Sequence, residues 1–171
     1  MSFPGATKSQ PMDANIQYAH VLICSTRPLR RNSVCSGDRV GREMGVDEMN
    51  RLVRSLWAVT SGEDEEAQVA VAWLARNQIC EARVSVKESC TRLLALSGQG
   101  ARPKPDGQSL DFRDASFCRA FAIACTVWAG DCADPTEGAT LAHRHDEEAP
   151  AWTERVTGTA LIGPWMFYRA R

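Results

Sequence analysis

The chain has 171 residues and a mass of 18.8 kDa, with 20 lysines and arginines against 21 aspartates and glutamates. Hydrophobic residues make up 44% and charged residues 24%, which is typical of a globular protein and excludes a fibrous or wholly disordered chain. The net charge of −1 provides no general attraction to nucleic acid, and the apolar runs are far shorter than the ~20 residues of a membrane span. We therefore expect one globular domain that binds no nucleic acid and does not span a membrane.

The first 46 residues predict an extended arm outside this domain. They contain three prolines, several glycines and serines, and six basic against three acidic residues, without helical periodicity. One apolar run, residues 18–24, predicts a short strand or a docking segment. The chain does not begin with the apolar segment of a secretory signal, so we expect it to be made in the cytoplasm without a signal peptide.

The pattern changes at residue 47, and residues 47–171 are predicted to form the globular domain. Asp47 is a candidate cap for a helix whose apolar residues recur at intervals of three and four. A turn at residues 61–62 is followed by four acidic residues, 63–66, which suit the start of a second helix. That helix, residues 67–79, is apolar on nearly all sides, which predicts a place in the middle of the core.

A short third helix and a loop are predicted next. Ser85 and Glu88 have the S-x-x-E spacing of a capping box, and they open a helix that runs through Leu94. Residues 97–109 are rich in glycine, proline and polar residues, which is typical of a loop.

The last helix and a small β region complete the expected α+β organisation. Asp111 or Asp114 begins a helix that Gly130 ends as a C-cap. Helical periodicity then stops, and residues 160–168 predict a strand with a break at Gly163 and the proline after it. The prediction is a helical core followed by a loop-rich β region at the C-terminus.

Neither the cysteines nor the histidines point to a metal site. The seven cysteines form no C-x-x-C pair and lack a close histidine, so we expect reduced thiols, many of them buried. His143 and His145 precede Asp146 in an H-x-H-D sequence, for which an exposed polar loop is expected rather than metal ligands. No cofactor is predicted, because no nucleotide-binding glycine motif is present.

Several short stretches follow one another in the order typical of one family. They are Q-V-A-V-A at 68–72, Asn77, D-P-T-E-G-A-T at 134–140, His143, P-A-W at 150–152 and I-G-P-W-M-F-Y at 162–168. In this order they resemble the bacterial and phage cell-wall hydrolases related to the spore cortex-lytic enzymes. The resemblance covers about residues 48–168 and leaves the arm outside.

The resemblance implies a mainly helical, lysozyme-like core and a protein that cleaves the glycan strands of peptidoglycan, as a glycosidase or a lytic transglycosylase. The family's catalytic glutamate begins an E-A-x-G-E motif, which falls on V-T-S-G-E at residues 59–63. Valine therefore stands at the position of the first glutamate, and Glu63 is the one candidate acid that remains. The residues that the resemblance implies for substrate binding are Asn77, Asp134, Thr136, His143, Trp152 and Tyr168.

Two functions stay open at this point. Glycosidic cleavage needs a general acid, which Val59 cannot provide, while Glu63 lies four residues further on and is a candidate substitute. The first hypothesis is an active peptidoglycan hydrolase that acts at the bacterial cell wall, carried in a phage tail. The alternative is a catalytically degenerate member that serves as a structural component of a virion or gene-transfer-particle tail, with residues 1–46 docking on other tail proteins.

Overall fold

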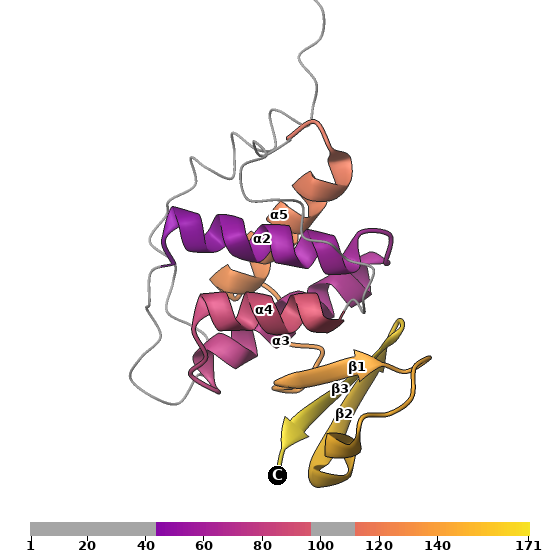
Figure 1. The fold of residues 1–171 in the computed structure, drawn as a ribbon. Helices are drawn as coiled ribbons and strands as arrows, with labels where there is room; N and C mark the ends of the chain where they lie inside the picture. The colour runs from indigo at the N-terminus through magenta and orange to yellow at the C-terminus, as the bar shows by residue number, and fades with distance from the viewer. Residues whose placement is uncertain (1–43, 97–111) are drawn as a thin grey trace, which may run out of the picture. The chain divides into compact units, whose positions relative to one another are not determined.

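The computed structural model describes residues 44–96 and 112–171 (Figure 1). Most of the predicted arm, its strand at 18–24 and the predicted loop at 97–109 lie outside these residues. In chain order the elements are helices α2 (Val46–Thr60), α3 (Glu65–Cys80), α4 (Val86–Leu96) and α5 (Ala115–Ala129), strand β1 (Leu141–Arg144), the 3₁₀ helix η2 (Ala151–Arg155), and strands β2 (Val156–Ile162) and β3 (Trp165–Ala170). The fold is α+β and dominated by helices, with the β region at the C-terminus, as predicted.

The predicted start of the first helix was wrong by two residues, whereas that of the second was close. Gly45, not Asp47, is the N-cap of α2, and Asp47 lies in the first turn, where its charge favours the helix dipole. Asp64 is the N-cap of α3, and its Oδ1 accepts a hydrogen bond from the Ala67 backbone N–H at 2.8 Å. The acidic stretch therefore acts as a helix start, except for Glu63, which precedes the cap.

The caps predicted for the other two helices are present. Ser85 Oγ accepts from the Glu88 backbone N–H at 3.2 Å, while the Glu88 side chain pairs with Arg92 instead of completing the capping box. Asp114 accepts from two backbone N–H groups at the start of α5. Gly130 ends α5 with a φ of +77°, the left-handed conformation that favours glycine.

Helix α3 lies at the centre of the helical core, as its apolar sequence predicts. Ala70, Val71 and Leu74 on this helix are completely buried, and α3 contacts each of α2, α4 and α5. Residues of these three helices complete the core, among them Leu52, Val53, Leu56, Leu93, Phe117 and Val127. In the parts of the chain described, no helix combines the length and the apolar character needed to cross a membrane.

The sheet is antiparallel, with β3 as its central strand between β1 and β2. Side chains alternate between the two faces along β3: Trp165 and Phe167 are fully buried, whereas Met166 and Tyr168 are half-buried on the opposite face. Trp165 and Phe167 join the hydrophobic core cluster. We call the face of Trp165 and Phe167 the inner face and the face of Met166 and Tyr168 the outer face.

Strand β1 corrects the prediction of an exposed loop around His143. His143 lies within the strand and pairs with Met166 of β3, so it belongs to the outer face, while Arg144 pairs with Trp165 on the inner face. Residues 145–147 form the turn that follows. The residue interval 160–168 predicted as one broken strand is a hairpin of β2 and β3, which turns at Gly163 and Pro164.

Candidate functional site

The segment that resembles the family's catalytic motif forms the end of α2 and the turn before α3. Val59 lies in the last turn of α2, is only 8% exposed and belongs to the hydrophobic core. Gly62 then adopts a φ of +105°, which turns the chain toward α3. The Glu63 backbone N–H donates to the Thr60 carbonyl at 3.0 Å, and Gln68 Nε2 donates to the Glu63 carbonyl at 2.9 Å. The turn therefore fixes the position of Glu63, at the edge of the helical core.

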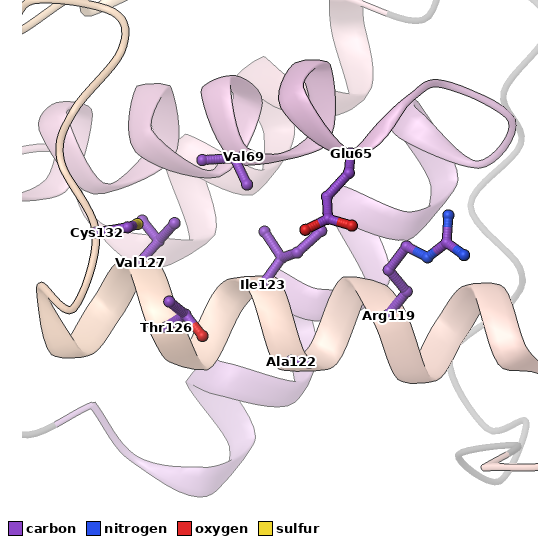
Figure 2. Close-up of a pocket in the computed structure, with 8 residues that line it drawn as sticks. All are labelled: Glu65, Val69, Arg119, Ala122, Ile123, Thr126, Val127 and Cys132. Atoms are coloured by element: carbon purple, nitrogen blue, oxygen red, sulfur yellow. The ribbon is translucent and has the colours of Figure 1, made fainter. Parts of the chain in front are cut away.

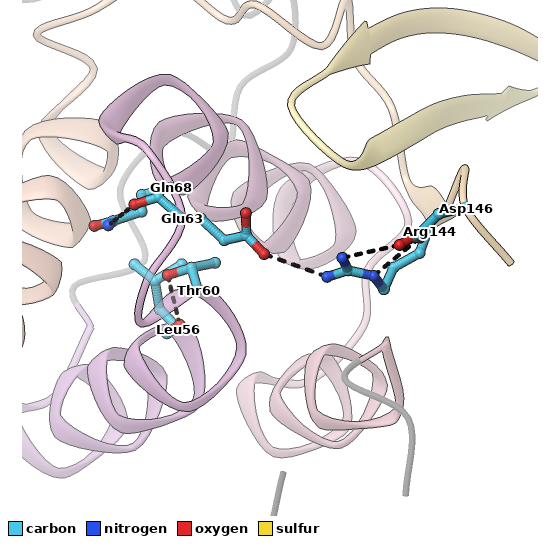
Figure 3. A network of polar contacts seen from close by, with 6 residues as sticks. All are labelled: Leu56, Thr60, Glu63, Gln68, Arg144 and Asp146. Carbon is cyan, nitrogen blue, oxygen red and sulfur yellow. Dashed lines mark hydrogen bonds and ion pairs between the residues drawn. The ribbon is translucent and has the colours of Figure 1, made fainter. Parts of the chain in front are cut away.

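The Glu63 carboxylate is paired with Arg144 (Figure 3). Arg144 Nη1 donates to Glu63 Oε1 at 3.2 Å, across the boundary between the helices and the sheet. The same guanidinium donates through Nε and Nη2 to the two carboxylate oxygens of Asp146, at 3.1 and 3.3 Å. Its carbon also lies 5.2 Å from the centre of the Trp165 ring. Arg144 thus joins two carboxylates at one edge of the inner face.

The contacts within this ionic triad (Glu63, Arg144 and Asp146) shift the pKa values of Arg144 and Asp146. The hydrogen bonds and charge of Arg144 lower the pKa of Asp146 below its ordinary value. Hydrogen bonds from Arg144 to Asp146 and, to a smaller extent, to Glu63 raise the pKa of the arginine. A general acid must donate a proton, whereas Glu63 Oε1 is engaged here as a hydrogen-bond acceptor for Arg144.

Three of the predicted substrate-binding residues form a second group, at the loop that precedes the sheet. Asp134 Oδ1 accepts from the backbone N–H and the hydroxyl of Thr136, at 2.8 and 2.7 Å. Asp134 Oδ2 accepts from the Gly138 backbone N–H and from Asn77 Nδ2, both at 2.9 Å. Thr136 is completely buried and Asn77 is 6% exposed. Asn77, Asp134 and Thr136 therefore anchor the loop to α3, and their polar groups are used within the protein.

Gln78 supports the same junction from the next position of α3. Its Nε2 donates to the Thr140 carbonyl at 3.0 Å, and its Oε1 accepts from Ser89 Oγ at 2.8 Å. Gln78 and Ser89 are both buried. This side chain connects α3, α4 and the start of β1, so it has a structural role.

The other three predicted substrate-binding residues form an aromatic cluster on the outer face. The ring centres of His143 and Tyr168 are 5.4 Å apart, those of Trp152 and Tyr168 5.3 Å, and those of His143 and Trp152 6.0 Å. Desolvation raises the pKa of Tyr168. His143 Nδ1 is buried and makes no hydrogen bond within the described part of the chain. Trp152 reaches the cluster from η2, which follows the P-A-W proline.

The structure thus separates the predicted site residues into three groups: Glu63 at the inner edge, the Asn77–Asp134–Thr136 anchor, and the outer aromatic cluster. Arg144, which pairs with Glu63, and Asp146, which binds the same guanidinium, were not predicted as site residues. No local signal pointed to Arg144, because an exposed loop was expected at this position and the strand that places its side chain on the inner face was not predicted. The pairing of Arg144 with Glu63 depends on a contact between residues that are 81 positions apart in the chain.

A separate pocket lies between α3 and α5 (Figure 2). Its volume is about 360 Å³, and it is lined mainly by aliphatic residues, with Glu65 and Arg119 at one end. None of the predicted site residues lines it. Within residues 44–96 and 112–171, no three His, Cys, Asp or Glu residues are grouped so that they could hold a metal ion.

Comparison with known proteins identified no relative: the chain matches no family model, no curated protein and no solved structure.

Proposed function

We propose that this chain is a cell-wall-hydrolase-like domain that binds the glycan strands of peptidoglycan without cleaving them, as a component of a virion or gene-transfer-particle tail. The proposal includes a lysozyme-like relationship for the helical core. It rests on the motif resemblance of residues 48–168 and on two features of the motif that should carry the catalytic acid. Valine stands at position 59, and Glu63 is paired with Arg144. The observation that carries it is the Glu63–Arg144 ion pair.

The chemistry of that pair argues against cleavage. Val59, at the position expected for the acid, has no proton to donate and is packed into the core. Glu63 is the remaining carboxylate of the motif, and Arg144 holds it as a hydrogen-bond acceptor. Losing a general acid typically lowers a rate by a factor of about 10²–10⁴. A protein with this arrangement keeps the surroundings of the site and lacks the group that protonates the leaving oxygen.

The outer aromatic cluster supports binding to a sugar chain. Its rings, His143, Trp152 and Tyr168, are each partly exposed, and they belong to three of the motifs that carry the resemblance. The C–H faces of sugar rings pack on aromatic side chains, while the polar edges of Trp and Tyr can bind hydroxyl groups. This cluster is therefore the proposed contact surface for glycan.

One specific observation favours a second candidate function, that of an active peptidoglycan hydrolase. Glu63 and Asp146 approach the same guanidinium from two elements, and their side chains are 24% and 54% exposed. Most glycosidases use two carboxyl groups, one as the general acid and the other as the nucleophile or base. In an active hydrolase, a bound sugar would displace Arg144 and leave Glu63 to act as the acid.

Purified full-length protein on peptidoglycan sacculi separates these functions. Binding is measured by co-sedimentation, and cleavage by release of soluble muropeptides. The binding proposal predicts co-sedimentation without release, unchanged in Glu63→Gln and reduced in Trp152→Ala. Release that Glu63→Gln abolishes, and that the exposed control Glu66→Gln preserves, would establish the hydrolase instead. Absence of both binding and release would contradict both functions.

Residues 1–46 are proposed to dock the domain on other tail proteins. Since α2 begins at Val46 with Gly45 as its cap, deletion of residues 1–43 should leave the domain folded. The shortened chain is expected to bind sacculi like the full chain and to fail to enter the particle. Normal incorporation of the shortened chain would refute this role for the arm.

A further inference from the structure

A pocket of about 640 Å³ lies beside the Asp134 loop, away from the aromatic cluster's three rings. It is formed by the second half of α3, the residues after α5 and the end of β3. The charged and polar residues of its lining that matter here are Arg76, Glu81, Cys132, Asp134 and Arg169, together with the Trp73 ring. None of the functions proposed above uses the two arginines.

Arg76 is a mostly buried residue whose guanidinium has no anionic partner within residues 44–96 and 112–171. The residue is only 8% exposed, and its guanidinium carbon lies 4.5 Å from the centre of the Trp73 ring. No carboxylate among the described residues lies within ion-pair distance of it. The Trp73 ring is held in turn by a hydrogen bond from its Nε1 to Cys132 Sγ, at 3.4 Å. A cation–π contact with tryptophan stabilises a guanidinium, but it supplies no acceptor for the guanidinium N–H groups, and the described residues supply none either.

The acidic residues in the pocket wall do not supply the missing acceptor. Asp134 already accepts four hydrogen bonds from Asn77, Thr136 and Gly138. Glu81 is exposed and forms no ion pair with either arginine. The Arg76 guanidinium lines the pocket and has donors that neither carboxylate takes up, so it could bind an anion that enters there.

Arg169 adds a second cation to the same pocket. It follows Tyr168 on β3, is exposed, and likewise has no ion-pair partner in the described part of the chain. Two guanidinium groups with open donors suit a planar or tetrahedral oxyanion, because each can bind two oxygens at once.

We propose that Arg76 and Arg169 bind the carboxylate or phosphate group of a small anionic ligand in this pocket. Arg76, held over the Trp73 ring, forms the fixed half of the site, and Arg169 forms the solvent-facing half. The site does not depend on peptidoglycan binding, since it uses neither Glu63 nor the aromatic cluster.

The test is an NMR titration of the full-length protein, in which the Arg76 side-chain Nε–H and the Trp73 Nε1–H resonances are followed. Inorganic phosphate and N-acetylmuramic acid, which has a free carboxylate, are the two anions, and N-acetylglucosamine is the matched uncharged sugar. We expect saturable shifts with at least one of the anions and none with N-acetylglucosamine. The anion that binds with the higher affinity then shows whether the site prefers a phosphate or a carboxylate group. The proposal would be overturned if neither anion caused a saturable shift, or if N-acetylglucosamine caused a shift equal to that of the anions.

Substitution of the arginines completes the test. Arg76→Gln is expected to weaken anion binding about tenfold or more, and Arg169→Gln to weaken it by a smaller factor. Arg155→Gln removes an exposed arginine of η2 that does not line the pocket, so its affinity should equal that of the intact protein. If Arg76→Gln does not fold, Arg169→Gln decides, since that side chain is exposed. Equal weakening in Arg155→Gln and Arg169→Gln would reveal a general charge effect and overturn the site.

Discussion

Asn77 Nδ2 donates a hydrogen bond to Asp134 Oδ2 at 2.9 Å, which ties the buried side of α3 to the loop that precedes the sheet. The two residues are separated by 57 positions, and both belong to the motifs that carry the resemblance. Their hydrogen bond connects α3 to the loop that leads into the β region. Their role is therefore structural, whatever ligand the domain binds.

Asp134→Ala is expected to destabilise the protein by about 2–4 kcal/mol, because it removes the acceptor of the buried Thr136 hydroxyl and leaves Asn77 Nδ2 with only its longer contact to Thr136 Oγ1, at 3.4 Å. Urea denaturation followed by circular dichroism measures the change. Asp131→Ala, in the same loop but at an exposed position, should change the free energy of unfolding by less than about 0.5 kcal/mol. Equal effects of the two substitutions would contradict the anchoring role of Asp134.

Gly62→Ala tests the turn that presents Glu63. A Cβ at this position would meet no atom within 4 Å, so the only cost is the φ of +105°, which is unfavourable for an L-residue. We expect a loss of about 1–3 kcal/mol in the free energy of unfolding. Thermal denaturation provides the measurement, with Ser61→Ala as the control at an exposed neighbour. A stable Gly62→Ala protein would show that the turn tolerates another conformation.

The ionic triad predicts a particular pH dependence. Arg144 lowers the pKa of Asp146 in the folded state, so the unfolded chain binds this proton more tightly. The contribution of the pair to stability is therefore present above the ordinary aspartate pKa of about 4 and is lost as the pH falls through the lowered value. We expect Arg144→Gln to be less stable than the intact protein at pH 7, with a difference that shrinks toward pH 3.

Denaturation curves at pH 7, 5 and 3 measure this difference. Asp146→Asn, which cannot titrate, serves as the control and should remove much of the change between pH 5 and pH 3. A difference between the intact protein and Arg144→Gln that stays constant down to pH 3 would exclude a contribution from the triad.

Introducing a carboxylate at position 59 tests the proposal that the domain lacks only the catalytic acid. Val59→Glu and Val59→Gln place side chains of similar size at a position that is 8% exposed, so both should lower stability, by about 1–3 kcal/mol. Only the glutamate can donate a proton. We expect muropeptide release from sacculi by Val59→Glu and none by Val59→Gln. Folded Val59→Glu protein that binds sacculi and releases nothing would show that the surroundings are not those of a hydrolase.

The local sequence was sufficient to locate the helices, apart from the N-cap of α2, and it was insufficient to predict strand β1. Asp64, Asp114 and Gly130 stand at helix ends where side-chain chemistry or backbone freedom decides the boundary. Gly45 was missed because it has no side chain of its own to cap the helix; the available signal was Glu48 three residues on, whose Oε2 accepts from the Gly45 N–H at 3.3 Å. Strand β1 has only four residues, and its pairing with β3 more than 20 positions away determines its conformation.

The arrangement of the candidate site needed the register of the sheet. His143 and Arg144 are neighbours in the chain, yet one joins the outer aromatic cluster and the other holds Glu63 on the inner side. A motif read along the chain places both in one site. Only the pairing with Met166 and Trp165 assigns each residue to its face.

The strand order has a consequence for biosynthesis. Because β3 lies between β1 and β2, neither of the two earlier strands has its hydrogen-bonding partner until the residues up to Ala170 have left the ribosome. The four helices are made first and can pack beforehand, with the surface that later receives Trp165 and Phe167 still open. A premature stop before Trp165 would therefore release a helical core with an uncovered apolar side, a species prone to aggregation and to capture by chaperones.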